Sequence, residues 1–196
     1  MTDPLMDTDD EAATPLTIEE RAALIPTYIM TRAQLNEAEQ IGIDDATLWA
    51  FARKRPVLTQ DFLKSLHKRM FGGVWRWAGE FRTTERNIGV DPWRIEPDLR
   101  TLLDDVRYWV EHKTYGADEI AVRFHHRLVF IHPFPNGNGR HSRLAADLLI
   151  TQLGETRFTW GGKNLVAPDQ LRKNYITALR RADQHEIDLL LKFARM

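Results

Sequence analysis

Pro133 separates two runs of apolar residues at helical spacing, and this break constrains the fold more than any other feature of the chain. Proline disfavours the α conformation at the residue before it, so we expect the first helix to end near Ile131 and to leave His132 extended. The Gly-Asn-Gly segment 137–139 then permits a tight turn into the second helix. The chain therefore predicts two helices joined by a short loop that begins with a histidine.

The residues of this loop suit the binding of phosphates. Arg140 and Arg143 are three positions apart and share one helix face, and guanidinium groups bind phosphate oxygens in bidentate geometry. Free N–H groups at a helix N-terminus attract anions, and Asn138 is expected to cap that helix through its side chain. His132 titrates near neutral pH, as a general base should. The segment indicates a polyphosphate site with a base at its edge.

Structural roles would explain the same residues without any ligand. The Pro-Asn-Gly-Asn-Gly segment 135–139 could be only a turn between two helices. His132 could be a buried structural histidine, and Arg143 could pair with Asp147 one turn later. Local chemistry leaves these alternatives open.

Composition excludes several classes of protein. The 196 residues are enough for one domain with a real core. The absence of cysteine excludes disulfides, thiolate metal sites and cysteine nucleophiles. A net charge of -1 gives no reason to expect nucleic acid or an anionic membrane as partner. The acidic start differs from a secretory signal, and no apolar run approaches the ~20 residues of a membrane helix. We expect a soluble, cytoplasmic protein.

The remaining pattern predicts a mainly α domain with one small β element. Residues 1–16 are acidic and read as a flexible leader. Helices are expected at 31–53 with a break near Gly42, from an N-cap at Thr59 to Gly72, at 97–110, 118–131 and 139–149, and at 169–182 and 185–195. Between them, residues 74–95 mix aromatic and β-branched side chains with glycines, which predicts an irregular segment and a short β-hairpin.

Several polar and aromatic residues outside the loop have competing interpretations. Arg82, Thr84 and Arg86 either line one side of the predicted hairpin or form a solvated rim. His141 is either exposed to solvent or in contact with a substrate. Trp75 and Trp77 are expected to anchor the hairpin, and residues 19–21 to form a solvated face.

The central segment resembles the Fic (Fic/Doc) family signature, His-Pro-Phe-x-Asp/Glu-Gly-Asn-Gly-Arg-x-x-Arg. Eight of its nine specified positions match: His132, Pro133, Phe134, Gly137, Asn138, Gly139, Arg140 and Arg143. Residues 66–82 resemble the family's upstream stretch, 87–90 its β-hairpin flap and 175–179 its closing segment, so the resemblance covers about residues 55–195. The whole chain resembles most the subset called mobile mystery protein B, which is usually found beside a helix-turn-helix partner.

The resemblance implies a single Fic-type helical domain at 55–196, preceded by a helical extension at 17–54. It implies transfer of AMP from ATP to a Ser, Thr or Tyr hydroxyl of a target protein. His132 would be the base. Gly137, Asn138 and Gly139 would hold the phosphates, and Arg140 and Arg143 would steady the leaving pyrophosphate. A flap would align the target by strand addition, and its residues are Thr83, Thr84, Glu85, Arg86, Asn87, Ile88, Gly89 and Val90.

Asn136 departs from the signature, because the family has Asp or Glu there to hold Mg²⁺. Mg²⁺ prefers charged oxygen ligands, so Asn136 is a weak metal candidate and reduced Mg²⁺ dependence is expected. The chain also lacks the family's inhibitory Ser/Thr-x-x-x-Glu-Gly/Asn string, which implies an unrestrained enzyme or a separate antitoxin partner. Two rival functions follow: transfer of another phosphate-containing group, and a catalytically weak module that binds nucleotide or a partner.

Overall fold

The computed structural model describes residues 16–162 and 168–196, and helices account for most of them. In chain order the elements are α1 (Ile18–Arg21), α2 (Arg32–Phe51), α3 (Gln60–Phe71), the 3₁₀ turn η1 (Pro92–Arg94), α4 (Ile95–His112), α5 (Ala117–Ile131), α6 (Asn138–Gln152), α7 (Pro168–Asp183) and α8 (Asp188–Arg195). The predicted mainly α fold is confirmed. The leader predicted at 1–16 lies, apart from Leu16, outside the described residues.

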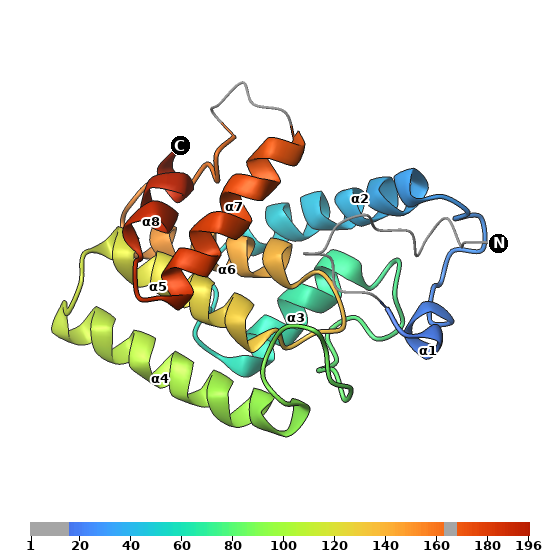
Figure 1. Cartoon of the computed structure of the whole chain (residues 1–196), viewed down its shortest axis with the longest axis horizontal. Coiled ribbons are helices and arrows are strands. Elements are labelled where there is room, and N and C mark those ends of the chain that lie inside the picture. The colour runs from blue at the N-terminus through green and yellow to red at the C-terminus, as the bar shows by residue number, and fades with distance from the viewer. Residues whose placement is uncertain (1–15, 163–167) are drawn as a thin grey trace.

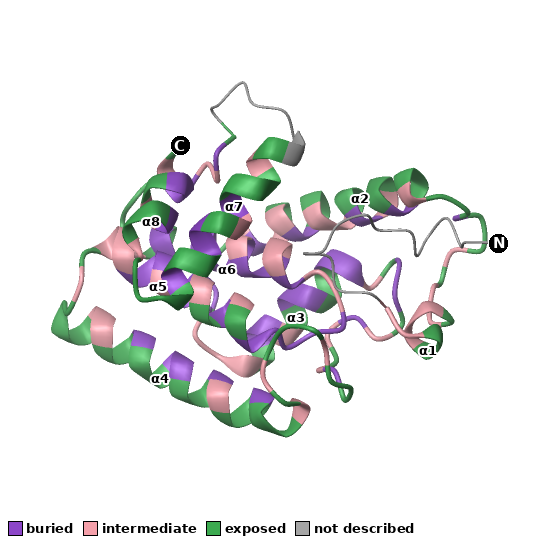
Figure 2. Cartoon of the chain, in the orientation of Figure 1, coloured by how far each residue is buried: buried purple, intermediate pink, exposed green. Residues whose placement is uncertain are grey.

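The two helices on either side of the central loop, α5 and α6, pack against each other at the middle of the fold (Figure 1). Helices α4 and α8 cover α5, while α2 and α3 pack against α6, and α7 lies against α8. Phe124, Leu128 and Ile131 of α5 are completely buried, and burying side chains of this size stabilises the fold by about 2 kcal/mol each. Figure 2 shows buried and exposed residues alternating along α4, as expected for a helix with one side on the core.

Local capping signals set several helix ends as predicted. The Thr59 hydroxyl accepts a hydrogen bond from the Phe62 N–H at 3.2 Å, which begins α3, and Gly72 ends it. The break expected near Gly42 is wrong, because α2 continues through it. A Cβ at Gly42 would lie 2.3 Å from the Met70 carbonyl oxygen. This glycine therefore allows α2 and α3 to approach closely and does not interrupt the helix.

The β-hairpin predicted for the flap is also wrong, since residues 83–90 form bends and irregular backbone and no strand runs through the described residues. The carbonyls of Thr84 and Val90 accept hydrogen bonds from the Arg82 guanidinium, so these acceptors do not pair across a ladder. The one isolated bridge found in the described chain joins Leu24 to Trp75. Over 16–162 and 168–196, none of the helices has the length and apolarity of a membrane span.

Candidate active site

His132 occupies the C-cap of α5 in the left-handed conformation, with φ 54° and ψ 59°. The helix ends at Ile131 as predicted, but the expected extended conformation of His132 is wrong. Its N–H still donates to the Leu128 carbonyl at 3.2 Å, and its carbonyl accepts from Arg82 Nε at 2.7 Å. Left-handed backbone costs a residue other than glycine about 1 kcal/mol or more. These contacts therefore hold the histidine backbone in an unusual conformation.

Burial controls the protonation of the His132 side chain. The pKa of His132 is lowered from 6.5 to about 4, so the near-neutral value expected from the sequence is wrong. Desolvation is the largest cause, since only 6% of the residue is exposed. The charges of Arg82 and, to a smaller extent, Arg86 also lower the pKa, and a hydrogen bond with the Val129 backbone opposes them. At neutral pH the imidazole is therefore uncharged, which is the state that can accept a proton.

The loop after His132 is closed by the side chain of Asn138. Its Oδ1 accepts from the Phe134 N–H at 2.9 Å, and its Nδ2 donates to the Phe134 carbonyl at 2.7 Å. The expected helix cap by Asn138 is therefore wrong: α6 begins at Asn138 itself, and its N-cap is Gly137, in the left-handed region. The buried Asn138 amide therefore fixes the backbone of the loop at Phe134.

The two loop glycines serve different purposes. Gly137 has φ 78°, and a Cβ on it would lie 2.6 Å from the Phe71 ring, so the fold itself requires glycine. A Cβ on Gly139 would meet nothing closer than the Tyr175 hydroxyl at 3.6 Å, an ordinary contact. A methyl group at Gly139 would therefore fit the fold, and the residue lies in the first turn of α6, where N–H groups have no partner within the helix.

His67 of α3 connects the loop to the body of the domain. The Gly79 N–H donates to its Nδ1 at 3.0 Å, so Nε2 carries the hydrogen and donates to the Asn136 carbonyl at 3.0 Å. Its ring stacks on Phe134 with centroids 3.8 Å apart. Burial holds the pKa of His67 well below its usual range. A neutral histidine in one tautomer thus fixes the loop backbone.

His141 also lies beneath the loop, which contradicts both interpretations considered for it. Its side chain is completely buried, and its Nε2 lies 3.0 Å from the Leu63 carbonyl oxygen. Burial lowers its pKa to about 4. Its position inside the motif therefore serves packing between α6 and α3.

The structure brings Arg140 and Arg143 to the start of α6 but gives them different surroundings. Nη1 of Arg140 donates to Glu39 Oε2 at 2.7 Å. The Arg143 guanidinium lies over the Tyr175 ring, 5.2 Å from its centroid. Among the carboxylates that the structure describes, none is within ion-pair distance of Arg143.

The proposed pairing of Arg143 with Asp147 is excluded. The Asp147 carboxylate accepts from Trp160 Nε1 at 3.0 Å and from Arg157 Nη2 at 3.3 Å. Because this carboxylate is buried, desolvation raises its pKa, and Arg157 opposes the shift most. Arg143 therefore has a different use from a simple helix-surface ion pair.

Arg82 is the residue whose importance sequence reasoning missed. Only 3% of it is exposed, and its guanidinium donates to the carbonyls of His132, Thr84, Val90 and Ile131. It is therefore neither lining the flap surface nor part of a solvated rim. A buried cation needs several acceptors, and Arg82 finds them in the two backbone segments that it joins.

The flap is mostly exposed but has one buried tether. The exposed residues are Thr83, Thr84, Glu85, Asn87, Ile88 and Gly89. Arg86 instead forms an ion pair with Glu20 of α1, and 5% and 14% of these side chains are exposed. The solvated face expected for 19–21 is therefore wrong at Glu20. Trp77, stacked on Trp75 with centroids 5.1 Å apart, donates its Nε1–H to the Glu20 carbonyl at 3.0 Å.

The protein side chains fit poorly with a metal held by this chain alone. Asn136 Oδ1 accepts from the Gly137 N–H at 2.6 Å. No group of three or more His, Asp or Glu side chains with metal-binding geometry occurs in residues 16–162 and 168–196. A single amide oxygen is a weak ligand set for Mg²⁺, which prefers charged oxygens.

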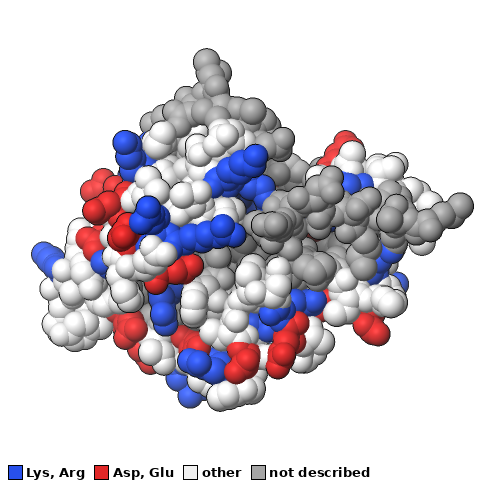
Figure 3. Space-filling model, in the orientation of Figure 1, with Lys and Arg blue, Asp and Glu red and all other residues white. Residues whose placement is uncertain are grey.

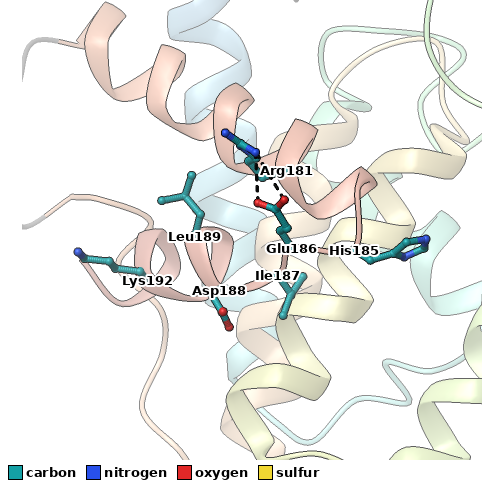
Figure 4. A pocket seen from close by; sticks show the side chains of 7 residues that line it. All are labelled: Arg181, His185, Glu186, Ile187, Asp188, Leu189 and Lys192. Carbon is teal, nitrogen blue, oxygen red and sulfur yellow. Dashed lines mark hydrogen bonds and ion pairs between the residues drawn. The ribbon is translucent and has the colours of Figure 1, made fainter.

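One hollow lies away from the motif. An open hollow of about 620 Å³ lies between the end of α7 and α8 (Figure 4). It is lined by Arg181, His185, Glu186, Ile187, Asp188, Leu189 and Lys192. Arg181 and Glu186 pair with each other across it. On the face drawn in Figure 3, acidic and basic side chains are intermixed, in keeping with a net charge of -1.

Comparisons with known proteins show what the whole chain is similar to. The Fic/DOC family model matches residues 57–150. The "Protein adenylyltransferase Fic" of Drosophila melanogaster is 31% identical over 165 residues, covering 79% of this chain and 31% of that protein. The chain thus spans about a third of the length of the curated relatives it matches.

Solved structures show the same fold. The BepC effector protein of Bartonella tribocorum, solved with bound AMPPNP, superposes with a TM-score of 0.69 at 18% identity, covering 90% of this chain and 98% of that one. Fic-1 (residues 134–508) from C. elegans gives a TM-score of 0.64 at 24% identity, covering 91% and 51%.

Proposed function

Because residues 57–150 match the Fic/DOC family model, we propose that this protein transfers AMP from ATP to a Ser, Thr or Tyr hydroxyl of a target protein. The observation that carries the proposal is the placement of a neutral, buried His132 beside an open helix N-terminus with two arginines on it. Relatives that align with 79% of the chain at 29% and 31% identity are named protein adenylyltransferases, which supports the same reaction.

In the proposed reaction His132 takes the proton from the target hydroxyl. The hydroxyl oxygen forms a bond to the α-phosphorus of ATP, and the bond from that phosphorus to the pyrophosphate oxygen breaks. Arg140 and Arg143 stabilise the charge on the departing pyrophosphate. N–H groups around Gly137 and Gly139 hold the phosphates. Asn138 keeps them aimed, since its own amide is bonded to the Phe134 backbone.

Residues 83–90 are the proposed docking surface for the target. Most of these residues are exposed, so an extended target segment could pair with those backbone groups that Arg82 does not occupy. Arg82 connects this surface to the His132 backbone. A target bound along the flap would therefore be held in a fixed relation to the base, which is the main requirement of a positioning mechanism.

Mg²⁺ would bind together with the nucleotide. When bound, it would neutralise phosphate charge. The chain offers one weak candidate ligand, Asn136, whose amide oxygen already accepts from Gly137. We propose that the nucleotide phosphates hold most of the ion's coordination and that the protein depends on Mg²⁺ less than a carboxylate-bearing relative would.

The finer assignments follow the resemblance seen in the sequence. We propose membership of the mobile mystery protein B subset, cytoplasmic location, and domain limits of 17–54 for the extension and 55–196 for the Fic-type domain. A separate antitoxin or helix-turn-helix protein is the proposed source of restraint. Expression of the wild type should then slow growth of the host, and His132→Ala should relieve this; equal toxicity of the variant would contradict it.

Incubation with ATP and a host lysate, followed by intact-mass analysis, tests the main proposal. A gain of about 329 Da on a protein, absent with His132→Ala, is the expected result and corresponds to AMP. Transfer of another phosphate-containing group is the alternative, because Asn136 stands where the family signature has a metal-binding carboxylate. A gain of about 80 Da would indicate phosphate transfer instead. ATP binding without any gain in mass would indicate a binding module.

A further inference from the structure

A buried carboxylate from the N-terminal extension binds the first arginine of the motif. Glu39 lies on α2, outside the family match at 57–150. Only 5% of its side chain is exposed, and both carboxylate oxygens are used: Oε1 accepts from Trp75 Nε1 and Oε2 from Arg140 Nη1, each at 2.7 Å. A buried charge destabilises a fold unless it is fully hydrogen bonded. The geometry at Glu39 meets this condition.

Arg140 is held from two sides by these contacts. Glu39 binds one terminal nitrogen, and the guanidinium lies 5.0 Å from the centroid of the Phe71 ring. A guanidinium has five N–H donors, and Glu39 accepts the single hydrogen bond that Arg140 donates within the described residues. With 32% of its side chain exposed, Arg140 is oriented by the protein and keeps donors for a ligand.

We propose that Glu39 is a positioning residue that orients Arg140 toward the phosphates of the nucleotide, and that Trp75 fixes Glu39. The inference rests on the proposed function and adds a residue of α2 to that site. An orienting partner is useful because a free arginine side chain loses rotamer entropy when it is fixed, and Glu39 imposes that order before the ligand arrives.

The contacts also indicate that Glu39 stays in place when phosphate binds. Its second oxygen is held by Trp75, which is buried and stacked on Trp77. Movement of the carboxylate would leave the buried indole N–H without its acceptor, which is unfavourable. Glu39 therefore supports Arg140 and does not act as a removable competitor for it.

Binding of ATP to the full chain, measured by calorimetry together with the melting temperature, tests this inference. Glu39→Gln should weaken ATP binding about tenfold, because the amide replaces a charged acceptor. Trp75→Phe keeps a ring in the core and should weaken binding about threefold. Glu37→Gln removes an exposed carboxylate from the same helix and should leave binding unchanged. If Glu39→Gln fails to fold, the ATP affinity of Trp75→Phe tests the proposal, and an unchanged affinity would overturn it.

A double-mutant cycle separates positioning from a general loss of structure. In an Arg140→Ala background, Glu39→Gln should have no further effect on ATP affinity. Equal losses in both backgrounds, unchanged affinity, or tighter binding by Glu39→Gln would each overturn the proposal.

If the wild type binds ATP but no target gains AMP, the proposed function fails while the affinities still decide the role of Glu39. A wild type that binds no ATP overturns both.

Discussion

The loop at 132–139 and the flap at 83–90 lie side by side but are held in opposite ways. Buried side chains brace the loop: Asn138 bonds Phe134 in both directions, and His67 bonds the Asn136 carbonyl. The flap has mostly exposed side chains and depends on Arg82 for its link to the loop. The segment that bears the proposed base is therefore fixed by buried contacts, while the segment proposed to dock the target has fewer of them.

Acid should destabilise the fold, because several of its buried histidines are uncharged at neutral pH. Burial lowers the pKa of His132 and His141 from 6.5 to about 4 and that of His125 to about 3. The unfolded chain therefore takes up protons first as the pH falls below 6.5, and the folded state loses stability from there down to about pH 4. Each histidine contributes about 1.4 kcal/mol per pH unit in that window.

Urea unfolding from pH 7.5 to 4.5 measures this loss. The free energy of unfolding should fall steeply below pH 6.5, and the steepness should decrease in His141→Gln. A flat profile between pH 7 and 5 would show that these histidines are not held neutral by the fold.

Alanine at the two loop glycines should separate the bracing of the loop from its ligand site. Gly137→Ala forces a Cβ into the Phe71 ring at a positive φ and should cost about 3 kcal/mol of stability. Gly139→Ala meets only an ordinary contact and should preserve or raise the melting temperature, since alanine favours helix.

Nucleotide binding should respond to Gly139→Ala in the opposite way. The added methyl occupies the space beside the first N–H groups of α6, so ATP affinity should fall at least tenfold in a well-folded variant. Thermal melting and ATP titration of both variants provide the check. An unchanged ATP affinity in Gly139→Ala would place the phosphates elsewhere.

Removal of Arg82 should free the flap and leave the loop formed. Arg82→Met deprives carbonyls of His132, Thr84 and Val90 of a donor, which should cost about 2 kcal/mol. It should also raise the pKa of His132, because Arg82 is the charge that lowers it most. Hydrogen exchange at 83–90 should accelerate, while exchange at 134–138 changes little. Arg94→Met, at an exposed arginine beyond the flap, is the matched control.

These contacts also show what the sequence could predict. The end of α5 at Ile131 and the start of α3 after Thr59 depend on neighbours a few residues away, and both predictions were correct. Arg82 and its acceptor on His132 are 50 residues apart, and Glu39 and Arg140 are 101 apart. No local pattern marks such pairs, because a buried arginine and a solvated one look alike in a sequence. The motif indicated which residues matter, while the tertiary contacts showed how they are held.

The smallest expected effect concerns the one position where the loop departs from its signature. Asn136→Asp would place a carboxylate where the amide now accepts from Gly137. Because a charged oxygen is a better Mg²⁺ ligand, Mg²⁺ should bind the ADP-loaded variant several-fold more tightly, as measured by calorimetry, with little change in melting temperature. His67 should continue to hold the Asn136 carbonyl, so the backbone of the loop should remain as it is. Equal Mg²⁺ affinity in the two proteins would mean that the nucleotide alone determines metal binding, and that the rigid loop contributes only its N–H groups and arginines.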